Sequence, residues 1–190
     1  MRIGIDIDDT IINTWEYFMP MFSEKFNISI DEIKKLPPYY GAIKDLISIN
    51  EFYNLMKEYE ELIYNVSLKE NVSKIITKLK EEGHTIIFIT ARSDNSYTNP
   101  YLISKKYLDN NSIPYDKIIV NAREKGPICK EEKIDLFIDD NFKNCTDVSN
   151  QGIEVLMMDA IFNKEAQGFT RVNNWQEVYE YIKNRWYYDK

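Results

Sequence analysis

Residues 1–12 read MRIGIDIDDTII, an apolar run that changes abruptly into a cluster of acidic residues. Three carboxylates, those of Asp6, Asp8 and Asp9, fall within four positions. Burying such a cluster costs several kcal/mol for each uncompensated charge. The stretch therefore indicates either a solvated turn after a strand or a site that holds a cation and a reacting group. Taken alone, it does not distinguish these two interpretations.

The apolar residues before the cluster predict a β-strand over residues 3–7. Isoleucines at alternating positions suit a pleated sheet, and the near-continuous hydrophobicity is typical of a central parallel strand that is buried on both faces. Because side chains alternate along a strand, we expect Asp6 and Asp8 to point to the same side of the chain. Ligands of open α/β sheets bind beyond the carboxyl ends of the strands, which is where both aspartates would lie.

The composition of the 190-residue chain suits one domain, or one domain with a small insertion. The net charge is −7, from 24 Lys and Arg against 31 Asp and Glu, and the chain contains no long basic run. A nucleic-acid polymer is therefore not the expected ligand, because such binding rests on a basic surface. A small phosphate ester is still a possible ligand, since its binding needs only a few local cations or amides.

We expect a cytoplasmic protein that does not contact a membrane. The first strand begins at about Arg2, which leaves no room for a signal peptide, and no apolar run approaches the length of a membrane span. Cys129 and Cys145 lack a metal-binding spacing and suit free thiols in a reducing compartment, with a disulfide as the alternative. His84, the only histidine, is interpreted as an ordinary turn residue.

Strands and helices alternate along most of the chain. Short apolar runs bounded by turn residues predict four further strands, at residues 85–89, 117–120, 135–138 and 153–157. Helical spacing and capping residues predict helices at residues 68–82, 100–108, 127–133, 142–150 and 174–185. This alternation predicts an α/β fold with right-handed crossovers and a doubly wound parallel sheet.

Residues 14–66 interrupt the alternation with helical and irregular sequence. We expect a first helix that Pro20 kinks, a short helix at residues 31–36 and an amphipathic helix capped by Asn50. The segment is far longer than a crossover helix requires, so it predicts a small helical cap inserted after the first strand and lying over the site. The core would then comprise residues 1–13 and 67–190.

The ends of two other strands would bring polar groups to the same edge as Asp6. The second strand ends in Ile89-Thr90-Ala91-Arg92, whose hydroxyl and turn amides can hold phosphoryl oxygens, although a threonine there is more often a local turn former. The fourth strand ends in Asp139-Asp140, which is a second change from apolar to acidic sequence. Two such changes in one sheet favour a catalytic site.

A lysine near the start of the short helix at 127–133 could complete this edge. Lys125 lies in the sequence Arg123-Glu124-Lys125-Gly126-Pro127, from which its ammonium could reach the carboxylates. Lys130 and Lys133 are competing candidates, and any one lysine in a lysine-rich chain can be a solvated surface charge.

The motifs of this chain follow one another on alternating strands in the order Asp6-x-Asp8-x-Thr10, Thr90, a lysine and Asp139-Asp140. They resemble the motifs of the haloacid dehalogenase superfamily of phosphohydrolases. The resemblance covers most of the chain, and the paired aspartates are the motif that is specific to this superfamily. Within the superfamily, the Ile-Thr-Ala-Arg, Arg-Glu-Lys and Ile-Asp-Asp-Asn motifs resemble the 5'(3')-deoxyribonucleotidases, of the cytosolic and mitochondrial type, and their bacterial nucleotidase relatives.

This resemblance implies Mg²⁺-dependent hydrolysis of a phosphate monoester, with a deoxyribonucleoside monophosphate as the expected substrate. It implies that Asp6 is the nucleophile and forms an aspartyl-phosphate, and that Asp8 is the acid and base, positioned by Thr10. It also implies that Thr90, the Ala91 amide and Lys125 hold the phosphate.

The resemblance further implies how the Mg²⁺ is held. Asp6, the backbone carbonyl of Asp8 and Asp140 would be the protein ligands, and Asp139 would orient a water molecule of the metal. Asp9 has no expected chemical role.

Two alternatives to a nucleotidase stay open. In a phosphatase for sugar or other small metabolite phosphates, the aromatic residues of the cap would serve only as its core. In a nucleotidase some of these aromatic residues would stack on the base, with Phe18 and Tyr40 as the first candidates. The aromatic residues of the cap are Trp15, Tyr17, Phe18, Phe22, Tyr39, Tyr40, Phe52 and Tyr53. The second alternative is a non-catalytic phospho-accepting or metal-binding regulatory domain, against which Asp8 and the long insertion argue. The sequence leaves open whether two copies form a homodimer.

Overall fold

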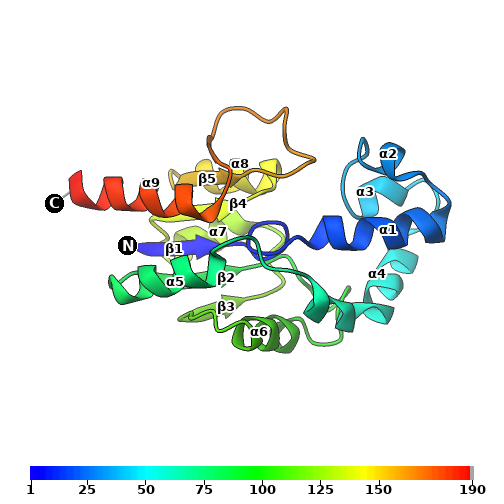
Figure 1. Ribbon diagram of the computed structural model, residues 1–190, viewed down its shortest axis with the longest axis horizontal. Helices are drawn as coiled ribbons and strands as arrows, with labels where there is room; N and C mark the ends of the chain where they lie inside the picture. Colours follow the sequence, from blue (N-terminus) through cyan, green and yellow to red (C-terminus); the bar gives the residue numbers. More distant parts are fainter. Residues whose placement is uncertain (189–190) are drawn as a thin grey trace.

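A single six-stranded parallel sheet forms the centre of the computed structural model, which describes residues 1–188 and the side chains of residues 1–185. The strand order is β3-β2-β1-β4-β5-β6, with every neighbouring pair parallel (Figure 1). The strands are β1 (Arg2–Ile5), β2 (Thr85–Ile89), β3 (Lys117–Ile119), β4 (Leu136–Asp139), β5 (Glu154–Met158) and β6 (Thr170–Val172). The predicted α/β fold with a doubly wound parallel sheet is thus confirmed.

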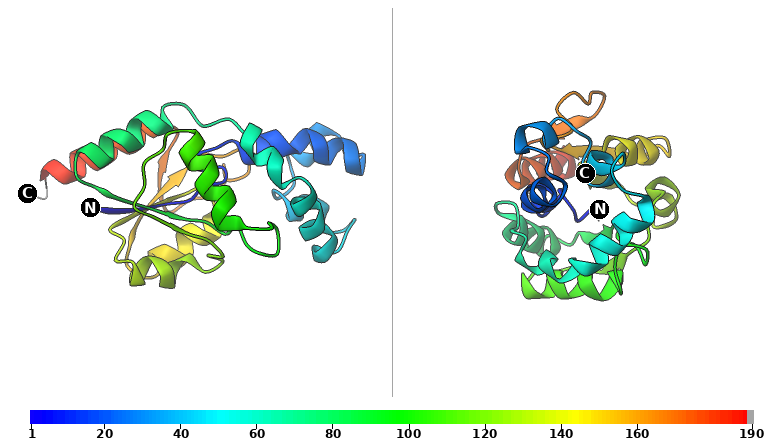
Figure 2. Two further views of the ribbon diagram at one scale, coloured as in Figure 1. Left: turned by 90° about the horizontal axis from the view of Figure 1, so that it is seen from below. Right: turned by 90° about the vertical axis from the view of Figure 1, so that its right-hand side faces the viewer.

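Helices cover both faces of this sheet (Figure 2). The helices α5 (Val72–Glu81), α6 (Pro100–Asn110) and α9 (Trp175–Tyr188) pack on one face, and α7 (Lys125–Glu131) and α8 (Phe142–Ser149) pack on the other. Alternation along β2 divides the core accordingly, because Ile86 and Phe88 join one apolar cluster while Ile87 and Ile89 join the other. The central strand is tightly packed, since a Cβ on Gly4 would lie 2.9 Å from Cδ2 of Phe137.

Two strand predictions need correction. The first strand ends at Ile5 rather than at residue 7, although the Asp6 amide still donates to the carbonyl of Ile138 at 2.9 Å. The edge strand β6 was not expected, because its three residues, Thr-Arg-Val, carry no apolar run and pair only with β5. The predicted helices of the core are present with ends that differ by a few residues.

Residues 14–66 form a group of helices beyond the carboxyl ends of the strands, to the right of the sheet in Figure 1. They are α1 (Thr14–Phe26), α2 (Ile30–Ile33), α3 (Tyr40–Ile43), α4 (Ile49–Glu58) and the 3₁₀ helix η1 (Glu60–Asn65). The cap of α4 is Ser48 rather than Asn50, because the Ser48 hydroxyl accepts from the Glu51 amide and the Glu51 carboxylate accepts from the Ser48 amide.

The chain enters and leaves this group of helices at one place. The Lys69 amide donates to the Ile11 carbonyl at 2.9 Å, and the Asn13 amide donates to the Ser67 carbonyl at 3.1 Å. The two connections therefore lie side by side, next to the acidic end of β1. Within residues 1–188, no helix is both long and apolar enough to cross a membrane.

Candidate active site

The carboxyl ends of β1 and β4 bring three buried aspartates together. Ile5 of β1 is in register with Ile138 of β4. Asp6, which follows β1, and Asp139, the last residue of β4, are therefore neighbours. Asp6, Asp139 and Asp140 each place a carboxylate oxygen within 4.8 Å of the others, and all three are buried. We call these three residues the acidic cluster.

Lys125, the first residue of α7, is the lysine that contacts the acidic cluster. Its Nζ donates to Oδ1 of Asp6 at 2.5 Å and to Oδ2 of Asp139 at 2.7 Å, and its side chain is fully buried. Lys130 is exposed on the same helix. Burial alone would lower the pKa of Lys125, but the carboxylates of Asp139 and Asp6 raise it.

The charges in the acidic cluster repel one another despite this lysine. Burial raises the pKa of Asp6 to about 7, against the opposing effect of Lys125. Burial and the neighbouring Asp139 raise the pKa of Asp140 well above its ordinary value. A further cation would relieve this repulsion, and carboxylate oxygens are the ligands that hard divalent cations prefer. The acidic cluster could therefore hold a divalent metal ion.

Asp8 belongs to a separate ion pair at the same sheet edge. Its Oδ2 accepts from Nε of Arg92 at 2.9 Å, and its Oδ1 accepts from Nη2 of Arg92 at 2.8 Å and from the Thr14 hydroxyl at 2.9 Å. Burial would raise the pKa of Asp8, but Arg92 and Thr14 hold that pKa below its ordinary value.

Thr10 does not position Asp8, which corrects the expectation from the sequence. Its hydroxyl donates to Oδ1 of Asp140 at 2.7 Å, so Thr10 orients a member of the acidic cluster. The partner of Asp8 is Arg92, a residue of the Ile-Thr-Ala-Arg motif for which we expected no role.

A cavity of about 290 Å³ joins the two groups of charges. Asp6, Asp8, Thr90, Ala91, Lys125 and Asp140 all line it, so the structure brings these predicted site residues together. Thr90 is buried, with its hydroxyl accepting from the Arg92 amide at 3.2 Å, and Ala91 is exposed. Asp139 lies outside this lining and accepts from Lys125 and from Nδ2 of Asn144.

The aromatic lining of this cavity comes from Tyr39, Phe52 and Tyr97. The two residues that we singled out for base stacking lie elsewhere. Phe18 is 2% exposed and packs against Tyr17, and Tyr40 packs against Phe52 with ring centroids 5.5 Å apart. Neither residue lines this cavity, whereas Tyr39 and Phe52, two other aromatic residues of the cap, do.

Asp9 links the acidic end of β1 to the helices of residues 14–66. Its Oδ1 accepts from the Trp15 amide at 2.9 Å, and its Oδ2 accepts from the Tyr39 hydroxyl. Burial raises the pKa of Asp9 to about 7, against the opposing effect of these two hydrogen bonds. Tyr39 was expected only as one of the aromatic residues of the cap, and its bond to Asp9, 30 residues away along the chain, was not predicted.

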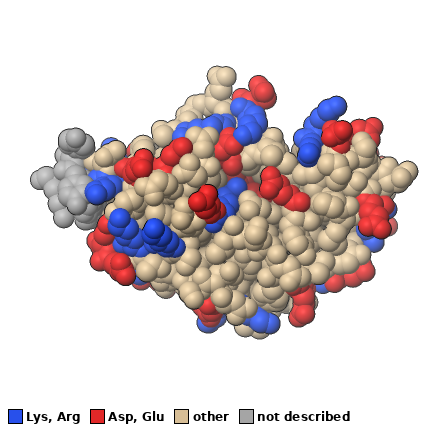
Figure 3. Space-filling model, viewed as in Figure 1, with Lys and Arg blue, Asp and Glu red and all other residues tan. Residues whose placement is uncertain are grey.

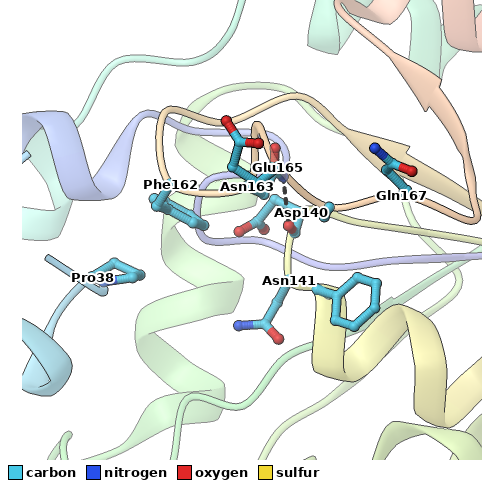
Figure 4. Close-up of a pocket in the computed structure, with 9 residues that line it drawn as sticks. Pro38, Asp140, Asn141, Phe162, Asn163, Glu165 and Gln167 are labelled. Atoms are coloured by element: carbon cyan, nitrogen blue, oxygen red, sulfur yellow. Dashed lines mark hydrogen bonds between the residues drawn. The ribbon is translucent and has the colours of Figure 1, made fainter. Parts of the chain in front are cut away.

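A second cavity, of about 690 Å³, is also lined by Asp140 (Figure 4). It is lined by residues of the loop between β5 and β6, among them Phe162 and Gln167, and by Pro38 from the segment between α2 and α3. Nδ2 of Asn163 in this loop donates to the Asp140 carbonyl at 2.7 Å. The acidic cluster is thus open to two cavities that share Asp140.

Residues 1–186 match the family described as "5' nucleotidase, deoxy (Pyrimidine), cytosolic type C protein". The chain belongs to this family. It is accordingly a phosphoric monoester hydrolase, and the resemblance to the 5'(3')-deoxyribonucleotidases that its motifs suggested is confirmed.

Individual relatives agree with this assignment. The chain is 34% identical over 184 residues to a nucleotidase of Clostridium acetobutylicum, covering 94% of this chain and 92% of the relative. It is 31% identical over 188 residues to the Bacillus subtilis protein named "Putative nucleotidase YqfW", covering 97% and 94% of the two chains.

The fold is also that of known structures. A haloacid dehalogenase-like hydrolase of Streptococcus pneumoniae superimposes with a TM-score of 0.67 at 14% identity, covering 95% of this chain and 97% of the other. At this identity the likeness supports the fold alone.

Proposed function

We propose that the protein is a Mg²⁺-dependent phosphomonoesterase that hydrolyses a nucleoside monophosphate, with deoxyribonucleosides preferred, through an aspartyl-phosphate. One observation carries this proposal. Asp6 and Asp8 line one cavity but have different cations, because Lys125 contacts Asp6 and Arg92 contacts Asp8. Burial and these charges together raise the pKa of Asp6 and lower that of Asp8, so the proposed roles also depend on the charges that the reactants supply. With Mg²⁺ bound, Asp6 would stay ionised as the nucleophile, and the anionic ester beside Asp8 would raise the pKa of Asp8 so that it can carry the proton.

The proposed reaction has two steps. A carboxylate oxygen of Asp6 attacks phosphorus, the bond from phosphorus to the ester oxygen breaks, and Asp8 gives that oxygen a proton. Water then attacks the phosphorus of the aspartyl-phosphate, the bond from phosphorus to the Asp6 oxygen breaks, Asp8 takes a proton from this water, and inorganic phosphate leaves. Thr90, the Ala91 amide and Lys125 hold the phosphoryl oxygens as charge shifts during both steps.

The donor set of the acidic cluster fits Mg²⁺. Asp6, Asp140 and the backbone carbonyl of Asp8 would hold the ion, and Asp139 would orient a water molecule, since its oxygens already accept from Lys125 and Asn144. The bound ion would supply positive charge between the carboxylates and the anionic ester.

We further propose that residues 14–66 act as a cap that selects the substrate. Tyr39, Phe52 and Met56 of this segment line the cavity that contains Asp6 and Asp8. All residues in the proposed mechanism belong to one chain, so a homodimer is not needed for the chemistry. Positive and negative side chains are interspersed on the face in Figure 3, so this face offers no continuous basic surface for a nucleic-acid polymer. The proposed substrate is a small molecule of the cytoplasm.

The experiment that tests this proposal is phosphate release from a panel of deoxyribonucleotides, ribonucleotides and sugar phosphates. We expect the highest kcat/KM for a deoxyribonucleoside monophosphate, activity that a chelator abolishes and added Mg²⁺ restores, and no activity in Asp6→Asn. Equal or better hydrolysis of sugar phosphates would replace the nucleotide assignment. A long-lived phosphoprotein without turnover would instead favour a regulatory domain.

A further inference from the structure

Arg92 is bound to both oxygens of Asp8, and its guanidinium is buried and makes two further contacts. Its side chain is 1% exposed, against 22% for Asp8, so the arginine lies behind the aspartate as seen from solvent. Nη1 of Arg92 donates to the Ser104 hydroxyl of α6 at 3.4 Å, and the guanidinium lies 5.7 Å from the ring centroid of Tyr97. Ser104 and Tyr97 are both buried. A planar guanidinium held in this way fixes the plane of a carboxylate, which a flexible ammonium cannot do.

The hydrogen bonds make the two oxygens of Asp8 unequal. Oδ1 accepts from both Nη2 of Arg92 and the hydroxyl of Thr14, which occupies its two lone-pair positions. Within residues 1–185, whose side chains the structure describes, Oδ2 accepts from Nε of Arg92 alone. One lone pair of Oδ2 therefore stays available to carry a proton.

We propose that Arg92 is a positioning residue for proton transfer, which orients Asp8 so that Oδ2 is the atom that gives and receives the proton. This inference rests on the proposed function, in which Asp8 protonates the leaving oxygen and later deprotonates water. The Arg92 side chain reaches Asp8 from the turn after β2, and its own amide donates to the Thr90 hydroxyl. One turn thus positions both a proposed phosphate ligand and the proton-transferring group.

The test compares two aryl esters of similar shape, phenyl phosphate and p-nitrophenyl phosphate. Phenolate needs a proton as it leaves, whereas the nitro group stabilises its phenolate and removes most of that need. In Arg92→Met, we expect kcat/KM for phenyl phosphate to fall by about 100-fold, because misplacing a catalytic group by about 1 Å costs that much. The value for p-nitrophenyl phosphate should fall much less. Because both esters report on the same folded molecules, their ratio does not depend on the fraction of active protein.

Two further variants separate positioning from a structural role. Arg92→Lys keeps the positive charge but loses the planar guanidinium that binds both oxygens of Asp8. The ratio of kcat/KM for phenyl phosphate to kcat/KM for p-nitrophenyl phosphate should therefore lie between the values for the wild type and Arg92→Met. Asp8→Asn should show the same dependence on the leaving group, and adding Arg92→Met to it should change the ratio no further. Arg2→Met is the matched control, since Arg2 begins β1 at the opposite end and bonds to the Glu132 carbonyl at 2.7 Å.

An equal loss for both esters in Arg92→Met and Arg92→Lys would overturn the inference and indicate that Arg92 binds phosphate or only maintains the fold. A further change of the ratio when Arg92→Met is added to Asp8→Asn would overturn it as well. If the wild type hydrolyses no phosphate ester with Mg²⁺ present, the proposed function fails. Turnover by the wild type with an unchanged ratio in the variants removes only the role of Arg92.

Discussion

At the scale of single residues, the sequence predicted which side chains meet but not how they pair. Asp6, Asp8, Thr90, Lys125 and Asp140 line one cavity because parallel strands place their carboxyl ends at one edge. Their roles in catalysis stay predictions.

Pairing between these side chains depends on distances of a few ångströms that no motif encodes. Thr10 lies two residues from Asp8, yet its hydroxyl donates to Asp140, which follows the neighbouring strand β4. Arg92 and Tyr39 approach their aspartates from distant segments, so only the folded chain identifies them as partners. The one signal in the sequence for a role of Arg92 was its position in the second motif, two residues after Thr90.

Removing the buried lysine should damage both stability and activity. Lys125→Met leaves Asp6 and Asp139 without their shared cation, so we expect the free energy of unfolding to fall by about 3 kcal/mol and phosphate release to fall by at least ~100-fold. Denaturant titration and a phosphate-release assay measure the two effects. Lys130→Met is the matched control, because Lys130 is exposed on the same helix. Loss of activity in Lys130→Met but not in Lys125→Met would contradict the assignment.

At the scale of elements, the core helices and most strands follow from apolar spacing, but two features of the chain do not. The edge strand β6 is too short to produce a pattern, and it forms because β5 offers a free edge. The cap of α4 was placed two residues late, since Ser48 and Asn50 are both good capping residues. The reciprocal bonds between Ser48 and Glu51 decide between them.

The capping box of α4 gives a direct prediction. Ser48→Ala removes the hydroxyl that accepts from the Glu51 amide, so we expect the protein to lose about 1 kcal/mol of stability in denaturant titration. Asn50→Ala, within the first turn of the same helix, should change stability by less than about 0.5 kcal/mol. Equal losses in the two variants would show that Ser48 is not the effective cap.

At the scale of the whole molecule, one chain forms a sheet whose acidic edge faces a group of helices from residues 14–66 (Figure 1). The long helical insertion after the first strand was readable from the sequence, because no crossover needs so many residues. Its boundaries as a separate cap, with a core of residues 1–13 and 67–190, stay a prediction.

The contribution of His84 to stability should fall in mild acid, because His84 is buried just before β2. Burial and the nearby amino terminus, 3.3 Å from Nδ1, lower the pKa of His84. The unfolded chain, with an ordinary histidine pKa of about 6.5, then binds a proton more readily than the folded one. The contribution of His84 to the free energy of unfolding should therefore decrease as the pH falls below that value, and it should be constant above it.

His84→Gln isolates this effect. Denaturant titrations at several pH values between about 5 and 8 should show that the free energy of unfolding of the wild type, relative to that of the variant, decreases as the pH falls. Parallel curves for the two proteins would mean that His84 does not have a lowered pKa.

Trapping the covalent phosphoryl intermediate that we propose on Asp6 is the most direct test of the mechanism. The protein is mixed with a deoxyribonucleoside monophosphate and Mg²⁺, quenched in acid during turnover and reduced with borohydride, which converts an aspartyl-phosphate into homoserine. Mass spectrometry of the amino-terminal peptide should then find homoserine at position 6 in the wild type and none in Asp6→Asn. Rapid turnover with no modification at position 6, or with full activity in Asp6→Asn, would contradict the account.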